Sequence, residues 1–198
     1  MSIIDINQLV TTLKKIQCHD TNLSFTQRSS DNHQKSVVNV LLQNGFSPTT
    51  KDYNNKKLND NCYFCLQPFG KQRAPDIILI RVKNGAKHIA KLELKKGNKK
   101  IMWNDGFPKE DTLYLFTDYK RSKTNLFCKH HLLSTDTELL FLKQCETIRK
   151  LNEKCKNING FRFYTRKANS QNISDTLIHQ NTTKEIEAFL KTNLGFNF

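Results

Sequence analysis

Three side chains between Arg73 and Gly97 have the types and spacing needed for metal-dependent chemistry. Asp76 stands just before an apolar, β-branched run, and Glu93 and Lys95 stand near the end of the next alternating run. Side chains two residues apart on a strand point to the same face, so Glu93 and Lys95 share one face while Leu94 points to the other. Two carboxylates beside an amine suit Mg²⁺, which prefers one or two carboxylates together with waters and phosphate oxygens.

A β-hairpin is the element that would bring these groups together. Residues 77–82 and 88–94 have the residue types of strands, and Lys83-Asn84-Gly85 between them is typical of a tight turn. In such a hairpin Asp76 lies roughly opposite Glu93 to Lys95. The alternative is a solvated hairpin face whose acids and lysine form only surface ion pairs.

The residues around the three side chains resemble the PD-(D/E)xK nuclease superfamily, through Pro75-Asp76 followed by Glu93-Leu94-Lys95. The stretches QPFGKQRAPDIIL, KLELKKG, IMWNDGFPKEDTLYLFTD and TNLFCKHHL, over roughly residues 67–131, are similar to type II restriction endonucleases. The resemblance implies an α/β (α+β) fold with a central mixed β-sheet flanked by helices, a restriction-endonuclease-like core. We expect residues 1–198 to form one such nuclease domain, with N-terminal helices and a C-terminal helical extension.

The resemblance also implies a mechanism. Asp76, Glu93 and Lys95 would be catalytic, and Mg²⁺ would be held by Asp76, Glu93 and the backbone carbonyl of Leu94. Lys95 would orient or deprotonate the attacking water, or stabilise charge at phosphorus. Cleavage would leave a 5′-phosphate and a 3′-hydroxyl, and a homodimer would cut both strands of a palindromic double-stranded DNA site.

The charge balance favours a polyanionic partner. The chain has 32 Lys and Arg against 18 Asp and Glu, for a formal net charge of +14. Phosphate backbones commonly account for such an excess, although a Lys- and Asn-rich proteome would also produce it. The residues expected to bind DNA flank the hairpin, in the loop before it and in the dense basic turn and Trp-Asn segment after it: Lys71, Gln72, Arg73, Lys96, Lys99, Lys100 and Asn104.

Helices and further strands are expected around the hairpin. The helices are 5–16 (capped by Asp5), 31–45, 135–156 (capped by Thr135 or Asp136, with an apolar side of Leu139, Leu140, Leu142, Ile148 and Leu151) and one beginning at Thr182. The strands are 63–66, 112–118, 125–132 and 161–164. In the resembled families a helix placed like 31–45 often supplies a Glu to the metal. This one has none, and His33, Gln34, Asn39 or no residue could take its place.

Two segments allow more than one interpretation. Residues 18–30 and 47–61 are polar and are expected to be loops, the second without core residues. Cys62-x-x-Cys65 could bind zinc with Cys128, His130 and His131, or its cysteines could be small apolar residues of a strand. The chain has no apolar run of about 18 residues and no secretory signal pattern, so we expect a cytoplasmic protein with no membrane association and with free thiols.

Two rival functions stay open at this point. A nuclease of the same superfamily could act on repair intermediates, junctions or nicks without a fixed recognition sequence. A non-catalytic basic module could bind nucleic acid while its acids form surface ion pairs. Structure-selective cutting would favour the first rival, and bound zinc without metal-dependent cutting would favour the second.

Overall fold

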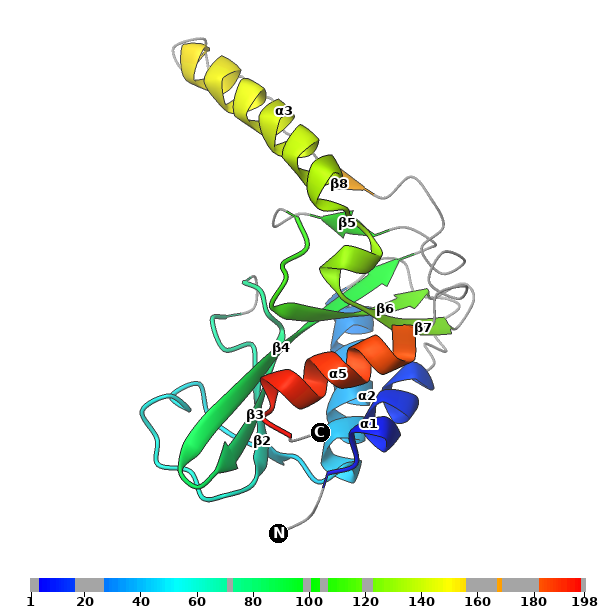
Figure 1. Ribbon diagram of the computed structural model, residues 1–198, viewed down its shortest axis with the longest axis vertical. Helices are drawn as coiled ribbons and strands as arrows, with labels where there is room; N and C mark the ends of the chain where they lie inside the picture. The colour runs from blue at the N-terminus through cyan, green and yellow to red at the C-terminus, as the bar shows by residue number, and fades with distance from the viewer. Residues whose placement is uncertain are drawn as a thin grey trace.

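A six-stranded mixed sheet forms the centre of the molecule, in the order β1-β2-β3-β4-β6-β7 (Figure 1). The computed structural model describes residues 4–16, 27–70, 73–97, 101–103, 107–118, 123–155, 167–168 and 182–196. The strands are β1 (Ser47–Pro48), β2 (Cys62–Leu66), β3 (Ile77–Lys83), β4 (Ala86–Gly97), β5 (Met102–Trp103), β6 (Thr112–Asp118), β7 (Lys123–Phe127) and β8 (Lys167–Ala168). The helices are α1 (Ile6–Lys14), α2 (Gln27–Gln43), the 3₁₀ helix η1 (Lys129–His131), α3 (Thr135–Lys154) and α5 (Thr182–Asn193).

The predicted hairpin is present and lies in the middle of the sheet. β3 and β4 are antiparallel, with Ile77 opposite Leu92, and β4 pairs in parallel with β6. Asn84 and Gly85 have φ angles of 52° and 75°, the left-handed conformations that a two-residue hairpin turn requires. The Asp60 carboxylate accepts hydrogen bonds from both turn N–H groups, at 2.7 and 3.2 Å. Because β4 pairs with β3 on one side and with β6 on the other, the strand that carries Glu93 has a neighbour on both sides.

One face of the sheet carries the main core, covered by α1, α2 and α5 (Figure 1). Asp5 caps α1 as predicted, since its side chain accepts hydrogen bonds from the backbone N–H groups of Asn7 and Gln8. The buried residues of this face include Leu9, Leu13, Val37, Leu41, Phe64, Ile77, Leu79, Leu92, Leu113, Leu115, Leu126, Ile186 and Leu190. A mixed sheet flanked by helices is thus confirmed as the fold class.

The opposite face of the sheet holds two smaller apolar clusters. Near β6 the cluster is Ile101, Trp103, Tyr114, Phe116 and Phe127, and near β3 it is Tyr53, Cys65, Ile78, Ile80 and Val82. The expectation that residues 47–61 contain no core is wrong, because Tyr53 is only 4% exposed. The Lys87 ammonium fixes this segment by donating to three of its carbonyls, at 2.8, 2.8 and 2.9 Å.

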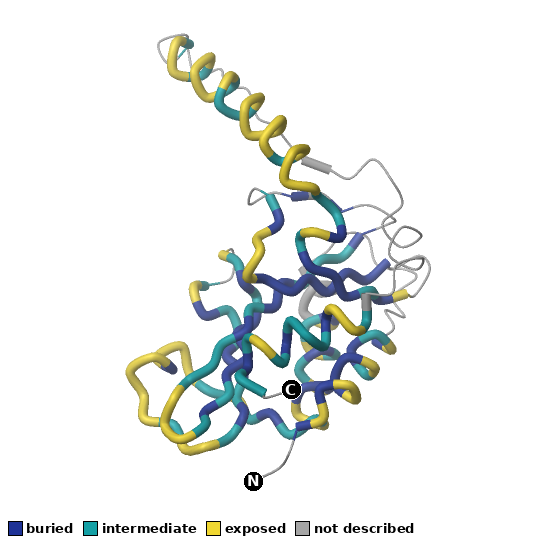
Figure 2. The backbone as a smooth tube through the Cα atoms, in the orientation of Figure 1, coloured by how far each residue is buried: buried dark blue, intermediate teal, exposed yellow. Residues whose placement is uncertain are grey.

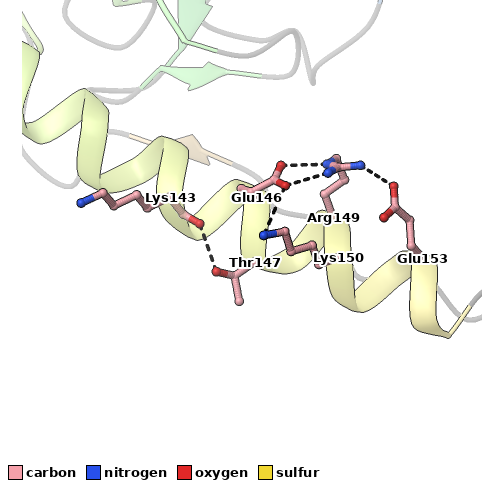
Figure 3. Close-up of polar contacts among 6 residues, drawn as sticks. All are labelled: Lys143, Glu146, Thr147, Arg149, Lys150 and Glu153. Carbon is pink, nitrogen blue, oxygen red and sulfur yellow. Dashed lines mark hydrogen bonds and ion pairs between the residues drawn. The ribbon is translucent and has the colours of Figure 1, made fainter.

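Helix α3 extends away from the sheet and buries none of its residues, all of which the structure describes (Figures 1 and 2). Its cap is Ser134, one residue before Thr135, the nearer of the two predicted caps. Leu139, Leu140, Leu142 and Leu151 of the expected apolar side are between 41% and 64% exposed. Figure 3 shows the ion pairs along the helix, where Arg149 bonds to both Glu146 and Glu153. The predicted helix is confirmed, but it does not pack against the core by this apolar side.

Several predicted boundaries change. Helix α2 begins at Gln27, inside a segment expected to be a loop, and β4 continues through Lys96 and Gly97, which were expected to begin a turn. The strand expected over 125–132 ends at Phe127 and is followed by η1. The short β5–β8 ribbon was not predicted, and the strand expected over 161–164 lies outside the described residues.

A chain of buried hydrogen bonds crosses the helical face at His33. The His33 Nε2 atom lies 2.8 Å from Thr117 Oγ1, which lies 2.8 Å from Thr124 Oγ1. Thr124 in turn donates to the Ile16 carbonyl at 2.6 Å. The network joins α2, β6, β7 and the segment that follows α1. Burial, assisted by the positive charge of Lys96, lowers the pKa of His33 to about 4.

This shift predicts a pH-dependent stability. Between pH 4 and the ordinary histidine pKa near 6.5, the unfolded chain binds a proton that folded His33 excludes, so the free energy of unfolding should rise with pH. The slope from this one group approaches about 1.4 kcal/mol per pH unit. Urea unfolding of the wild type and of His33→Gln across this range should show the slope reduced in the variant. Equal slopes would contradict a neutral, buried His33.

Candidate active site

Backbone N–H groups hold the carboxylates of Asp76 and Glu93 in place, one from Asp76 itself and one from Leu94. Asp76 immediately precedes β3, and the register that pairs Ile77 with Leu92 places it beside Glu93. The Asp76 N–H donates to Glu93 Oε2 at 3.2 Å, and the Leu94 N–H donates to Asp76 Oδ2 at 2.8 Å. The two carboxylates therefore converge at the point where β4 continues beyond the start of β3.

Lys95 completes this group, which we call the carboxylate site (Asp76, Glu93, Leu94 and Lys95). Its ammonium lies 2.8 Å from Glu93 Oε1, and the two side chains are only 16% and 7% exposed. The ammonium also lies 5.7 Å from the centre of the Trp103 ring. Glu93 and Lys95 share a face, while Leu94 packs against the main core on the other face, as the alternation predicted. A largely buried ion pair needs such additional partners to offset its desolvation.

A cavity of about 160 Å³ opens beside Glu93 and Lys95. We call it the aromatic cavity because four of its lining residues carry aromatic rings. Its lining residues are Phe69, Ala74, Pro75, Lys91, Glu93, Lys95, Trp103, Phe107, Lys109, Thr112 and Tyr114. Glu93 and Lys95 of the carboxylate site therefore face a hollow that is apolar over much of its wall and carries three lysines.

The rim of the aromatic cavity is organised by polar contacts. Lys91 forms an ion pair with Asp111, and the hydrogen bond from Lys91 holds the pKa of that carboxyl below its usual value. The Tyr114 hydroxyl accepts a 2.8 Å hydrogen bond from the Lys109 N–H, and burial raises the pKa of Tyr114 to about 12. Tyr114 is therefore a neutral wall group at physiological pH.

Only part of the predicted DNA-binding set falls on described residues. Arg73 is exposed just ahead of Asp76. Lys96 alternates with Lys95 and lies on the helical face, where its charge acts on His33. The remaining predicted contacts lie outside the described residues: Lys71, Gln72, Lys99, Lys100 and Asn104.

None of the three α2 residues considered as a further metal ligand contacts the carboxylate site in the contacts that the structure describes: His33, Gln34 and Asn39. His33 bonds to Thr117 on the helical face, opposite the face of Glu93. The Gln34 side-chain oxygen accepts a 3.3 Å hydrogen bond from Gln67, and Asn39 is exposed. Gln67 donates its backbone N–H to the Asp76 carbonyl at 2.7 Å, so Gln34 is linked to the site through a neighbouring backbone rather than as a ligand.

Cys62, Cys65 and Cys128, which the structure describes, do not assemble the predicted zinc site. Cys62 and Cys128 belong to the main core, whereas Cys65 belongs to the cluster on the opposite face. Burial raises the pKa of Cys62 to about 11 and that of Cys128 to about 12, which keeps both as thiols. The cysteines of the strand thus behave as small apolar residues.

His130, His131 and Glu185 are the group within the described residues whose atoms are close enough for a metal. His131 Nδ1 accepts a 2.8 Å hydrogen bond from the Cys128 N–H, so a neutral ring carries its proton on Nε2. That proton is donated to Glu185, and the hydrogen bond lowers the Glu185 pKa. Because the Nε2 atom carries the proton, it suits a hydrogen bond that joins η1 to α5 rather than coordination of a metal ion.

Sequence reasoning did not find the aromatic lining. Phe69 and Phe107 stand in loops next to glycine, where nothing in the local pattern indicates that they would meet Trp103 and Tyr114. The one available signal was the presence of aromatic residues on both flanks of the hairpin.

Comparison of the chain with protein-family models, with curated proteins and with solved structures gives no significant match. Among the helices that the structure describes, none is long and apolar enough to cross a membrane.

Proposed function

We propose that this protein is a Mg²⁺-dependent endonuclease of the restriction type, with a restriction-endonuclease-like core, that makes double-strand breaks at a specific DNA sequence. The observation that carries the proposal is a set of three hydrogen bonds that places two carboxylates and an ammonium together: Asp76 N–H to Glu93, Leu94 N–H to Asp76, and Lys95 to Glu93. Support also comes from the order of these residues along a hairpin that is followed by a parallel strand.

The donor set fits a hard divalent cation. Asp76 and Glu93 provide carboxylate oxygens, and an extended residue directs its N–H and C=O to the same side of the strand, so the Leu94 carbonyl faces the Asp76 edge. Oxygen ligands of this kind suit Mg²⁺. When bound, the metal would lower the pKa of a coordinated water toward neutrality and neutralise phosphate charge.

The chain's own residues would do the positioning. Asp76, Glu93 and the Leu94 carbonyl would hold the metal, and the Leu94 N–H keeps the Asp76 carboxylate in place. Lys95 would release Glu93, and its ammonium would then orient the water or stabilise charge on the phosphate; in the neutral amine form Lys95 would instead accept a proton from the water. The strands fix all of these groups before substrate arrives, and such preorganisation is a large part of electrostatic catalysis.

Double-stranded DNA is the proposed partner, bound by a homodimer in the cytoplasm. The net charge of +14 favours phosphate binding, which should weaken steeply as salt rises. Cutting both strands of a two-fold symmetric site requires two active sites, which a dimer supplies.

Digestion of a long unmethylated duplex by the purified protein tests the proposal. Discrete fragments with Mg²⁺, none with EDTA, and 5′-phosphate ends are the expected result. A smear, or nicks only at junctions and gaps, would indicate a repair-type nuclease instead. Salt-sensitive binding without cutting would contradict an enzyme and favour the binding module.

A further inference from the structure

The aromatic cavity has features that phosphodiester hydrolysis alone does not require. Two carboxylates, a lysine and a metal suffice for hydrolysis, yet the hollow beside them is walled by the rings of Phe69, Trp103, Phe107 and Tyr114. These rings come from loops and strands that are separate in sequence, and β5 and β6 contribute two of them.

Two of the rings are fixed. Trp103 is 7% exposed and meets Tyr114 edge-on, with centroids 5.2 Å apart and planes at 80°. Tyr114 stacks on Phe127 with centroids 5.4 Å apart and planes at 14°. Because this part of the wall is packed from behind, it keeps its shape whether or not a ligand is present.

The other two rings are accessible. Phe69 is 54% exposed and lies seven residues before Asp76 in the chain. Phe107 is half-buried and packs against Phe141 of α3 at 5.7 Å. The aromatic cavity therefore combines a fixed wall with ring surfaces that a planar ligand could reach.

The remaining lining residues add positive charge. Lys91, Lys95 and Lys109 line the same hollow, and with Asp111 paired to Lys91 and Glu93 paired to Lys95 the three lysines still leave a net positive charge there. A ligand that matches both properties has a flat, aromatic part and a negative part, and a nucleotide has both. Aromatic side chains bind bases by stacking, largely without regard to sequence, and Lys can pair with the phosphate.

We propose that the aromatic cavity receives a single nucleobase swung out of the DNA stack, with Phe69 stacking on it, so that the adjoining phosphate is presented to the carboxylate site. This inference rests on the proposed nuclease function, and it adds the form in which the substrate is bound: duplex DNA with one nucleotide extruded from the stack beside the cut. Enzymes that accept an extruded base pay for its unstacking through contacts of this kind.

Trp103 provides the test, because it is the only tryptophan in the chain and lines the aromatic cavity. Its fluorescence is titrated in EDTA with a short single-stranded oligodeoxynucleotide and with an abasic strand of equal length and charge. The oligonucleotide with bases should quench Trp103 and bind at least about fivefold more tightly than the abasic strand. Equal quenching and affinity for both strands would overturn the proposal.

Two variants sharpen the result. Phe69→Ala should lose at least about fivefold in affinity for the strand with bases and little for the abasic strand. Leu42→Ala removes another exposed apolar side chain, on α2, and should change neither value. A Phe69→Ala protein that keeps its circular dichroism spectrum and binds like the wild type would overturn the role of Phe69.

A second measurement separates this inference from the nuclease proposal. A duplex carrying 2-aminopurine becomes fluorescent when that base leaves the stack, and the uncut complex in EDTA should show the increase. Cleavage by the wild type with no increase at any position would overturn the base cavity and leave the nuclease intact. Base-dependent quenching of Trp103 without any cleavage would overturn the nuclease proposal and leave the base cavity intact.

Discussion

Cleavage of duplex DNA by Asp76→Ala is expected to fall at least about a thousandfold below the wild type. The substitution removes a proposed metal ligand and also the acceptor for the Leu94 N–H, 2.8 Å away, so the edge of β4 loses its fixed partner. DNA binding should persist or become tighter, because a negative charge near the phosphate is lost. Single-turnover cleavage and a filter-binding titration measure the two properties on the same protein.

Asp111→Ala is the matched control for that result. Asp111 is an exposed acid close to the same cavity, and it pairs with Lys91 rather than with Glu93 or Lys95. Its loss should leave cleavage within a fewfold of the wild type. Undiminished cleavage by Asp76→Ala, or equal losses in both variants, would contradict the assignment of the metal site.

Leu92→Ala is expected to lower the free energy of unfolding by about 2–5 kcal/mol. Leu92 is fully buried in the main core, directly before Glu93, between Ile77 on β3 and Leu113 on β6. Truncation removes transfer free energy and leaves a cavity that paired strands on both sides cannot readily close. Denaturant unfolding followed by circular dichroism measures the loss.

The same chemical change on the surface provides the comparison. Leu42 is 47% exposed on α2, so Leu42→Ala should shift the free energy of unfolding by no more than about 0.5 kcal/mol. Similar losses for the two variants would contradict the placement of Leu92 at the centre of the core. A strong loss only for Leu92→Ala would also show that the strand carrying Glu93 depends on the packing of its other face.

The hairpin and its acids could be predicted because their signals are local. The turn at Asn84-Gly85 and the alternation along β4 determine which residues oppose each other, and the contact of Asp76 with Leu94 follows from that register. The Asp5 cap and the strand over residues 112–118 could be predicted for the same reason, since capping and β-propensity depend on only a few neighbouring residues.

The features that were missed depend on contacts between distant segments. Tyr53 stands in a polar stretch, and it is buried because it packs against apolar residues of the sheet, while Lys87 of the hairpin binds carbonyls of its segment. The leucines of α3 have the composition of a packing face, but the helix leaves the sheet and they stay exposed. The aromatic cavity likewise forms only when the loops of Phe69 and Phe107 meet the sheet.

Binding of Mn²⁺, followed by electron paramagnetic resonance as a substitute for Mg²⁺, tests most directly whether Asp76 and Glu93 form a metal site. The wild type and Asp111→Ala should take up the ion with the same affinity, while Asp76→Ala and Glu93→Gln should lose at least about tenfold. Indistinguishable binding curves for all four proteins would show that these carboxylates only form ion pairs, and would contradict a metal-dependent nuclease at this site.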